Sequence, residues 1–262
     1  MESLTKEERR QVAEALRSNL PVADARHGLA HPRRGTAYER FGKRSIDIVV
    51  SLAALVATAP INGVLAVGTY LDVGRPLLFT QERAGKDGVP FTLVKFRNMT
   101  NELDERGELL PPEQRVTRWG RFVRRTSLDE LLNFWSVLKG DMSIIGPRPL
   151  LPEYTDRYCE YHAARLAVRP GLECPPNPRA DDAGGWEGQF QSDVWYAENI
   201  SLINDLKKFI RLMEAVFNKR STAIRGGAAR SYFMGYDGDG RAVSLTELDG
   251  ELVERSLGKD LA

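Results

Sequence analysis

The longest hydrophobic run of the chain covers residues 48–71 and contains no charged side chain. A run of this length can reach across the hydrocarbon core of a bilayer. Pro60 lies near its middle, where the missing backbone donor predicts a kink or a break in the helix. Thr58 and Asn62 are the nearby side chains that can bond the backbone groups freed there.

Three arrangements of this run fit the hydrophobic pattern. A straight helix would cross the membrane once, and a buried helix would form the core of a soluble protein. A helix broken at Ala59 and Pro60 would enter and leave the membrane by the same face, and the central proline favours this arrangement. Basic residues before the run favour a cytoplasmic N-terminal flank, and they are Arg33, Arg34, Arg40, Lys43 and Arg44.

Shorter periodic patterns predict a mixture of helices and strands elsewhere in the chain. The pattern of the last helix, at residues 193–217, fits a core helix and a membrane-surface helix equally well. The predicted elements are helices at residues 2–20, 128–139 and 193–217, strands at 76–81 and 91–96, and a β-hairpin turning at 238–240.

Composition and charge narrow the classes of partner. With 42% hydrophobic and 28% charged residues, the chain is neither generally disordered nor collagen-like. The net charge of +1 gives no overall attraction to a polyanion, but residues 115–125 carry five arginines at helical spacing beside Trp119 and Phe122. No recognition motif accompanies this stripe, so nucleic acid is not an expected partner. A phosphate-rich membrane surface or a phosphorylated substrate fits the stripe better.

Cysteine and histidine residues are few and scattered. The two cysteines form no CxxC pattern, which argues against a disulfide scaffold or a structural zinc site and fits a reducing compartment. The three histidines, His27, His31 and His162, are too far apart in the sequence to predict a metal centre, and they are expected at the surface or in loops.

Asp129 and Glu130 form an acidic pair at the start of the helix predicted at 128–139. Ser127 and Glu130 have the spacing of a capping box, which would give Glu130 a purely structural role. The turn GPRP at residues 146–149 can aim Arg148 back towards this helix start. The pair is therefore a candidate either for helix capping or for chemistry.

Several motifs occur in an order that resembles one known family. They are LVKFRNM at 93–99, RVTRWGRFVRRTSLDEL at 115–131, LKGDMSIIGPRPL at 138–150, VRPG at 168–171 and SDVWYAENISLINDLKKF at 192–209. Together with the hydrophobic run, this series resembles the bacterial sugar transferases that act as polyprenyl-phosphate phosphoglycosyl transferases. These are monotopic membrane enzymes that begin glycan assembly. The resemblance covers about residues 38–220.

The resemblance implies an α+β fold, with a small, mainly helical catalytic domain and short strands. The re-entrant membrane helix, broken at Pro60, would occupy residues 38–75 and the catalytic domain 76–220. Residues 1–37 would be an N-terminal helical extension with a linker, and 221–262 a C-terminal extension with the hairpin. The expected location is the cytoplasmic face of the bacterial inner membrane, in contact with its lipids.

The implied reaction is transfer of a sugar 1-phosphate from a nucleotide diphosphate sugar, usually a UDP-sugar, to polyprenyl phosphate through an aspartyl-phosphosugar intermediate. A carboxylate that attacks a diphosphate brings two anions together, so cations are needed around it. The resemblance implies that Asp129 is the nucleophile and a ligand of the required Mg²⁺, that Glu130 assists, and that the substrate-binding residues are Lys95, Arg124, Arg148 and Pro149.

Two departures from the family pattern affect these expectations. The family commonly has Ser-Pro at the helix break, where this chain has Ala59 and Pro60. The sequence after VRPG, residues 172–185, also differs, which bears on recognition of the donor. A membrane-anchored binding or scaffold protein derived from the family is the alternative function. The sugar and the oligomeric state stay open, with a homo-oligomer among the alternatives.

Overall fold

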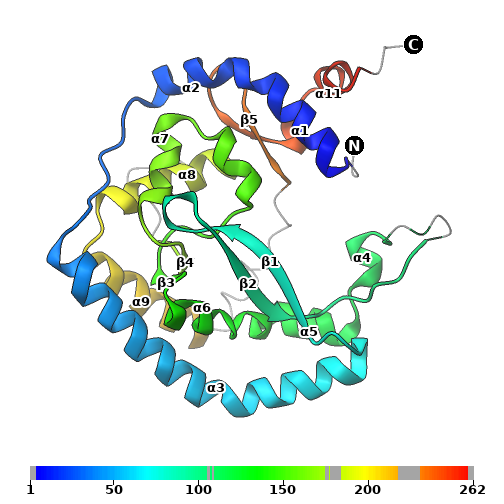
Figure 1. Ribbon diagram of the computed structural model, residues 1–262, viewed down its shortest axis with the longest axis vertical. Helices are drawn as coiled ribbons and strands as arrows, with labels where there is room; N and C mark the ends of the chain where they lie inside the picture. Colours follow the sequence, from blue (N-terminus) through cyan, green and yellow to red (C-terminus); the bar gives the residue numbers. More distant parts are fainter. Residues whose placement is uncertain are drawn as a thin grey trace.

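The computed structural model describes residues 4–104, 107, 109–174, 177, 184–217 and 231–258. Helices dominate, as expected (Figure 1). The labelled helices are α1 (Lys6–Ala15), α2 (Leu20–His27), α3 (Lys43–Val73), α4 (Pro112–Arg115), α5 (Arg118–Arg125), α6 (Asn133–Lys139), α7 (Glu160–Ala163), α8 (Gly185–Glu198), α9 (Leu202–Phe217) and α11 (Gly250–Ser256). The helix predicted at 193–217 is therefore two helices, α8 and α9.

The strands of the described residues pair two by two. The strands β1 and β2 are antiparallel, β3 and β4 are parallel, and β5 and β6 are antiparallel around residues 237–240, where the sequence predicts a turn. Their bounds are β1 (Leu78–Ala84), β2 (Pro90–Phe96), β3 (Ser143–Ile145), β4 (Gly171–Glu173), β5 (Phe233–Tyr236) and β6 (Ala242–Ser244). The mixed α and β composition is confirmed.

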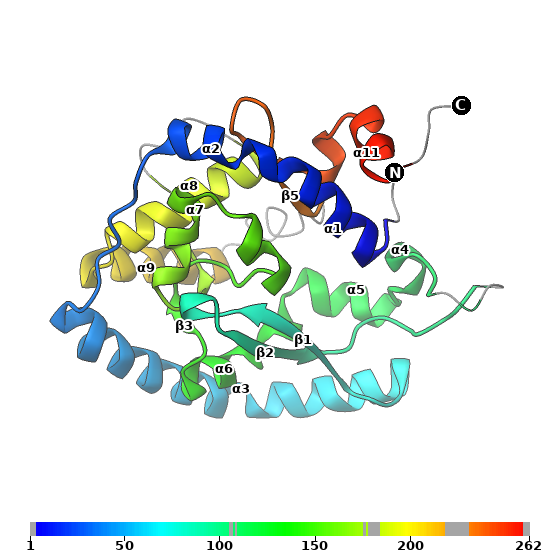
Figure 2. The ribbon, with the colours of Figure 1, turned by 45° about the horizontal axis from the view of Figure 1, so that its top comes forward.

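The helix α3 lies along one side of the molecule, and α1 and α2 lie on the opposite side (Figure 2). The β1–β2 hairpin and α7 occupy the space between them in both ribbon views. The strand β5 and the helix α11 accompany α1 on the side away from α3. The fold therefore has a long helix as its base and a layer made from both terminal regions on the opposite side.

The helix α3 continues through Pro60 instead of ending there. Figure 1 shows that its axis changes direction along its length, as a proline inside a helix predicts. Near this bend Thr58 Oγ1 donates to the carbonyl of Ala54 at 2.7 Å, and Asn62 Nδ2 lies 3.4 Å from Thr58 Oγ1. Pro60 leaves the carbonyl of Val56 without its usual helical donor, and the two side-chain bonds lie beside that carbonyl in the sequence without reaching it.

Most of α3 is exposed although it is strongly apolar. Its most hydrophobic window has a mean hydropathy of 2.1, and only 11% of that window is buried. A core helix of a soluble protein would be largely buried, so that arrangement of the hydrophobic run is wrong. The exposed apolar side chains of α3 include Val49, Leu52, Val56, Val64, Val67 and Leu71.

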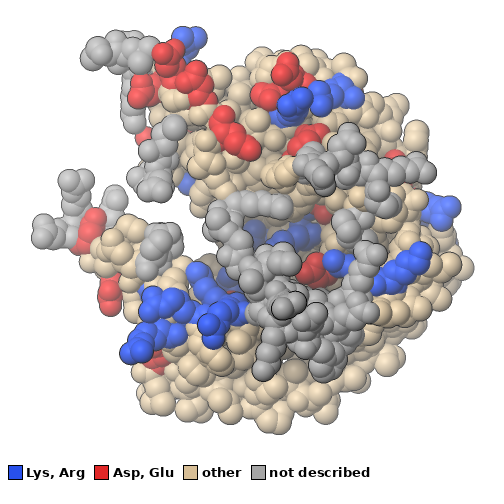
Figure 3. All heavy atoms as spheres, turned by 180° about the vertical axis from the view of Figure 1, so that it is seen from behind, with Lys and Arg blue, Asp and Glu red and all other residues tan. Residues whose placement is uncertain are grey.

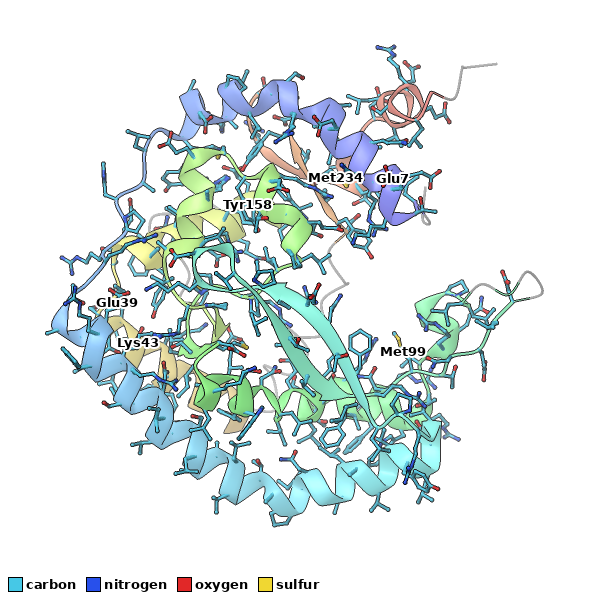
Figure 4. The ribbon with its side chains drawn as sticks, in the orientation of Figure 1. Glu7, Glu39, Lys43, Met99, Tyr158 and Met234 are labelled. Atoms are coloured by element: carbon cyan, nitrogen blue, oxygen red, sulfur yellow. The ribbon has the colours of Figure 1, made fainter. Side chains whose placement is uncertain are left out.

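The N-terminal end of α3 is attached to the folded domain by buried polar contacts. Lys43 Nζ lies 2.6 Å from Asp205 Oδ2 on α9, and Figure 4 shows Lys43 beside that helix. One turn later, Asp47 Oδ1 accepts from Ser143 Oγ at 3.1 Å and from the backbone N–H of Ile144 at 3.0 Å. These contacts join α3 to β3 and α9.

The C-terminal end of α3 returns to the same domain. Thr117 Oγ1, at the N-cap of α5, donates to Asp72 Oδ2 at 2.6 Å. Trp119 packs so closely on α3 that a Cβ at Gly68 would lie 2.3 Å from the indole ring, so only glycine fits there. Leu65 is buried with Phe96 and Val123 from β2 and α5. Both ends of α3 thus contact the folded part of the chain that follows it.

The segment predicted as one helix at 128–139 consists of two elements. Residues Leu128–Glu130 form a short 3₁₀-helix, and α6 begins only at Asn133. Ser127 has φ +55° and its side chain caps no backbone group. A capping residue normally has extended backbone, so this left-handed conformation explains why the predicted capping box is wrong. Glu130 is consequently free of that structural role.

The two terminal regions pack together and against the catalytic domain. Val12 of α1 and Leu16, which directly follows α1, are buried with Met234 of β5 and Val253 of α11 (Figure 4). Asn19 Nδ2 donates to the carbonyl of Tyr236 at 2.8 Å. A second cluster joins side chains of α2, β5 and β6 to the aromatic core of α8, and it includes Ala23, Tyr158, Trp186, Phe190, Phe233 and Ala242.

Candidate active site

Asp129 is a buried carboxylate, with 5% of its surface exposed. Asn98 Nδ2 donates to Asp129 Oδ2 at 3.0 Å. Burial raises the pKa of the Asp129 carboxyl, and the adjacent Glu130 raises it further, while Lys95 opposes both effects. The carboxylate is therefore held in a place where its negative charge is costly and cations are close.

Asn98 connects Asp129 to the arginine stripe of α5. Arg124 Nε donates to Asn98 Oδ1 at 3.0 Å, which orients the amide so that its NH₂ group faces Asp129. A Cβ at Gly120 would lie 2.1 Å from the Asn98 carbonyl oxygen, so glycine permits this close approach. The sequence analysis missed Asn98, although the motif LVKFRNM contains it beside Lys95.

The β1–β2 hairpin contributes two partly buried cations on one face. Lys95 pairs with Phe79 across the strands, and Arg83 pairs with Phe91. Because side chains alternate along a strand, Phe79 and Arg83 share the face that carries Lys95. Burial lowers the pKa of Lys95, whereas the charges of Asp129 and Glu130 raise it. Lys95 Nζ also lies 5.5 Å from the centre of the Phe79 ring.

Arg83 is a second cation that the sequence analysis missed. Burial lowers its pKa, with a further lowering from the charge of Arg148 and an opposing effect of Glu130. Its Nη2 donates to Gln81 Oε1 at 2.7 Å. The alternation of β1, which places Arg83 on the face of Lys95, was the signal that could have found it.

The GPRP turn directs Arg148 to Glu130, as the sequence predicts. Arg148 Nη2 lies 3.2 Å from Glu130 Oε1, and the two side chains are 62% and 39% exposed. The neighbouring Pro149 is buried, and its ring restrains the backbone that presents Arg148. The carbonyl of Arg148 accepts from Arg165 Nη2 at 2.7 Å. Arg148 is thus a solvent-facing cation on a fixed backbone.

The site as a whole is two carboxylates surrounded by guanidinium and ammonium groups. Lys and Arg side chains gather around a hollow on the face shown in Figure 3. Such an arrangement can hold phosphate groups against a nucleophilic carboxylate. The oxygen donors of Asp129 and Glu130 also suit Mg²⁺, which binds through one or two carboxylates and substrate phosphates.

Other predicted residues lie outside this cluster. Ala59 and Pro60 are exposed in the middle of α3. The divergent segment 172–185 falls largely outside the described residues. Arg115 lies at the end of α4, whereas the remaining arginines of the stripe belong to α5, so the stripe spans two helices.

Comparison with known proteins places residues 38–219 in one family, described as bacterial sugar transferases. An uncharacterized sugar transferase of Bacillus subtilis is 44% identical over 63% of this chain and 82% of its own length. An undecaprenyl-phosphate galactose phosphotransferase of Salmonella typhimurium is 32% identical over 69% of this chain. A UDP-N-acetylgalactosamine-undecaprenyl-phosphate N-acetylgalactosaminephosphotransferase of Aeromonas hydrophila is 33% identical over 72% of it.

The Salmonella and Aeromonas relatives are longer proteins, of which the matched regions are 41% and 45%. The family match extends over more than half of the chain and contains every residue of the carboxylate cluster. It leaves the terminal layer of α1, α2, β5, β6 and α11 outside. The chain therefore belongs to the bacterial sugar transferase family.

Proposed function

We propose that this protein transfers a sugar 1-phosphate from a UDP-sugar to polyprenyl phosphate, with Asp129 as the nucleophile. The observation that carries this proposal is the buried Asp129 carboxylate, which accepts from the side chain of Asn98 and lies near cations of β2 and α5. The names of the Salmonella and Aeromonas relatives support transfer of a phosphosugar to undecaprenyl phosphate. The scaffold alternative receives no comparable support.

The proposed reaction has two displacements at one phosphorus atom. An Asp129 oxygen attacks the phosphorus that bears the sugar, the bond to the bridging oxygen breaks, and UMP leaves with that oxygen. A phosphate oxygen of the polyprenyl phosphate then attacks the same phosphorus and releases the Asp129 carboxylate. Dividing the transfer in this way lets one site use a water-soluble donor and a lipid acceptor in turn.

The surrounding residues have distinct parts in this scheme. Asn98 and Arg124 hold the Asp129 carboxylate in position, and Lys95 and Arg148 bind phosphate oxygens of the donor. Mg²⁺ held by Asp129 and the diphosphate, with Glu130 beside it, would neutralise charge on the leaving group. Pro149 contributes by restraining the turn of Arg148. In these roles Lys95, Arg124 and Arg148 lie near the negative charge that develops during transfer.

The activity test is release of UMP from a panel of UDP-sugars by the full chain in detergent, with polyprenyl phosphate and Mg²⁺. Donor added without acceptor should leave a phosphosugar on Asp129, which peptide mass spectrometry can locate. The Asp129→Asn variant should form no adduct. An adduct on another residue would reassign the nucleophile, and turnover without any adduct would favour direct transfer between the substrates.

The proposed location is the cytoplasmic face of the bacterial inner membrane, with α3 as a re-entrant helix. A straight span would place its two ends on opposite sides of the bilayer, yet both ends of α3 contact the catalytic domain. The helix α1 precedes α3 in the sequence, and β5 begins more than 150 residues after α3 ends. These two elements nevertheless pack against each other. Segments that touch lie on the same side of a membrane, which supports the re-entrant topology.

Thiol labelling can test this topology in intact cells. Cysteines are placed at the exposed positions Ser18 and Asp239, in separate variants whose native Cys159 and Cys174 are replaced by alanine. A membrane-impermeant reagent should label neither position until the cells are opened. Labelling of position 239 alone in intact cells would establish a single span and contradict the proposal.

A further inference from the structure

His27, His162 and Glu187 come together under the turn between β5 and β6, although they are far apart in the sequence. One potential ligand atom from each residue lies within 4.8 Å of the other two. His27 ends α2, His162 belongs to α7 and Glu187 is in the first turn of α8. The prediction that the histidines are scattered surface residues is thus wrong for two of them, because helix packing brings them together.

The hydrogen bonds of the Tyr236 hydroxyl allow the proton of His162 to lie on Nδ1. The hydroxyl of Tyr236 accepts from the Cys159 backbone N–H at 3.0 Å, bonds the Cys159 side chain, and lies 2.9 Å from His162 Nδ1. A hydroxyl has one proton and two lone pairs. If the hydroxyl donates its proton to the Cys159 sulfur, its two lone pairs accept from the Cys159 backbone N–H and from His162. Nδ1 of His162 is then the protonated nitrogen.

This assignment leaves a lone pair on His162 Nε2. That atom is buried and has no hydrogen-bond partner among the described residues. The whole side chain is 0% exposed, so solvent does not replace the missing partner. A neutral imidazole with a free nitrogen is the form that binds metals.

The other two side chains complete a donor set. His27 Nε2 lies 3.4 Å from Glu187 Oε1 and 3.1 Å from the carbonyl oxygen of Gly240. Neighbouring ligand atoms of a tetrahedral zinc ion are separated by about 3.3 Å when the metal–ligand bonds are about 2.0–2.1 Å long. The separations around His27 match a hydrogen bond from its Nε2–H to the Gly240 carbonyl, and they also match two ligands of one zinc ion, whose binding would displace that proton.

The carboxylate of Glu187 is also held in place from outside the cluster. Gln191 Nε2 donates to Oε1 at 2.9 Å, and the backbone N–H of Ala242 donates to Oε2 at 2.9 Å. Metal ligands are commonly oriented by such outer hydrogen bonds, as Tyr236 orients His162. The Glu187 side chain is 11% exposed and that of His27 is 7% exposed, so the cluster is shielded from water.

We propose that His27, His162 and Glu187 bind a Zn²⁺ ion, with the Gly240 carbonyl or a water as the fourth ligand. Two imidazole nitrogens and a carboxylate select zinc over magnesium, which prefers oxygen ligands alone. The ion would fasten α2 to α7, α8 and the β5–β6 turn, and would thus join both terminal regions to the catalytic domain. This site is separate from the carboxylate cluster and does not depend on the proposed transfer.

Metal titration of the full chain tests the proposal. Protein in detergent is stripped with a chelator and titrated with Zn²⁺, and elemental analysis should find one tightly held zinc per chain in the presence of excess Mg²⁺. Co²⁺ in its place should give the visible absorption of a tetrahedral site. The melting temperature should rise by about 5–10 °C at a zinc concentration about 100-fold above Kd.

Variants locate the metal. His27→Gln should lose the bound zinc and the melting shift while keeping its circular dichroism spectrum, and Glu187→Gln should bind zinc more weakly. His31→Gln is the matched control because His31 is exposed only four residues away, and it should behave as the wild type. Asp129→Asn should also keep the zinc. Equal zinc binding by His27→Gln and wild type, or zinc lost with Asp129→Asn, would overturn the proposal.

Discussion

Two buried aspartates of this protein have opposite surroundings. Asp193 on α8 is 1% exposed and forms a pair with Arg165, whose Nε and Nη2 lie 2.9 and 2.8 Å from the carboxylate. Asp129 is 5% exposed, and the side-chain donor at its carboxylate is the neutral amide of Asn98. Among the described residues, Lys95 and Arg124 are the cations that act on Asp129, and neither forms a direct ion pair with it, which leaves both available to an incoming diphosphate.

One buried aspartate holds the structure together, and the other is suited to act as a nucleophile. The Arg165–Asp193 pair is saturated, and Arg165 also bonds the carbonyl of Arg148, so the pair fixes the turn at the edge of the active site. Burial raises the pKa of both carboxyls, but at Asp193 the charge of Arg165 is the main opposing effect, whereas at Asp129 the negative charge of Glu130 adds to the effect of burial. A carboxylate that is poorly stabilised as an anion is a better nucleophile than a saturated one.

The largest expected effect comes from Asp129→Asn. Transfer should fall by about 10⁴-fold or more, because the amide cannot act as an anionic nucleophile. The folded-state pKa of Asp129 is raised, so the ionised carboxylate destabilises the fold above that pKa, and this cost disappears as the pH falls. The variant should therefore melt at the same temperature as the wild type or higher at neutral pH. UMP release and thermal unfolding measure the two effects, and near wild-type turnover would remove Asp129 from the mechanism.

The opposite outcome is expected for Asp193→Asn. Removing one partner leaves the buried Arg165 unpaired, so the free energy of unfolding should fall by about 3–5 kcal/mol, as measured with denaturant. The double variant Arg165→Met with Asp193→Leu should recover part of this loss, since no unpaired charge remains. Wild-type stability of the single variant would show that the two aspartates do not differ in the way described.

Arg148→Ala should lower kcat/KM for the donor by about 10- to 100-fold, because the variant loses one charge-assisted hydrogen bond to the donor. Its pair with Glu130 is largely exposed, so the melting temperature should change little. Arg34→Ala is the matched control, because Arg34 forms an exposed pair with Asp87 at 3.1 Å. The control should leave donor use unchanged. Equal losses of stability and activity with Arg148→Ala would indicate a structural role.

The smallest expected effect is a shift in the pH profile. Asp129 must be ionised to attack, so the rate should fall on acidification through its raised pKa, above the range of an ordinary aspartate. Glu130→Gln removes a negative neighbour that raises this pKa. The acid limb of kcat/KM should therefore move to lower pH in the variant. An unchanged limb would show that another group controls it.

Local patterns predicted much of the fold. The strands at β1 and β2 and the membrane-type helix α3 follow from alternation and from a long apolar run, which depend on neighbouring residues only. The capping box at Ser127 fitted its local sequence but is absent, because Ser127 adopts a left-handed conformation with φ +55° instead of the extended one that a capping residue needs. Tertiary context overrides such a motif without leaving a trace in the sequence.

The residues of the candidate site that belong to the family motifs could be predicted from the sequence. Asp129, Glu130, Lys95, Arg124 and Arg148 all belong to the quoted motifs and cluster as electrostatic neighbours. Asn98, Arg83 and the histidine cluster were missed for different reasons. An asparagine carries no charge pattern, Arg83 required the strand register, and His27 meets His162 only after α2 has packed against the catalytic domain.

The pairing of the two terminal regions has a consequence for biosynthesis. Asn19 and its partner Tyr236 are 217 residues apart in the sequence. At about 5–20 residues per second, the ribosome delivers β5 about 10–40 s after α1. During that interval α3 emerges and can enter the membrane, while the apolar side of α1 that carries Val12 has no strand to cover it. With the proposed membrane topology the nascent chain would be anchored before β5 can cover α1. Any product that terminates before residue 233 presents an uncovered helix to chaperones and proteases.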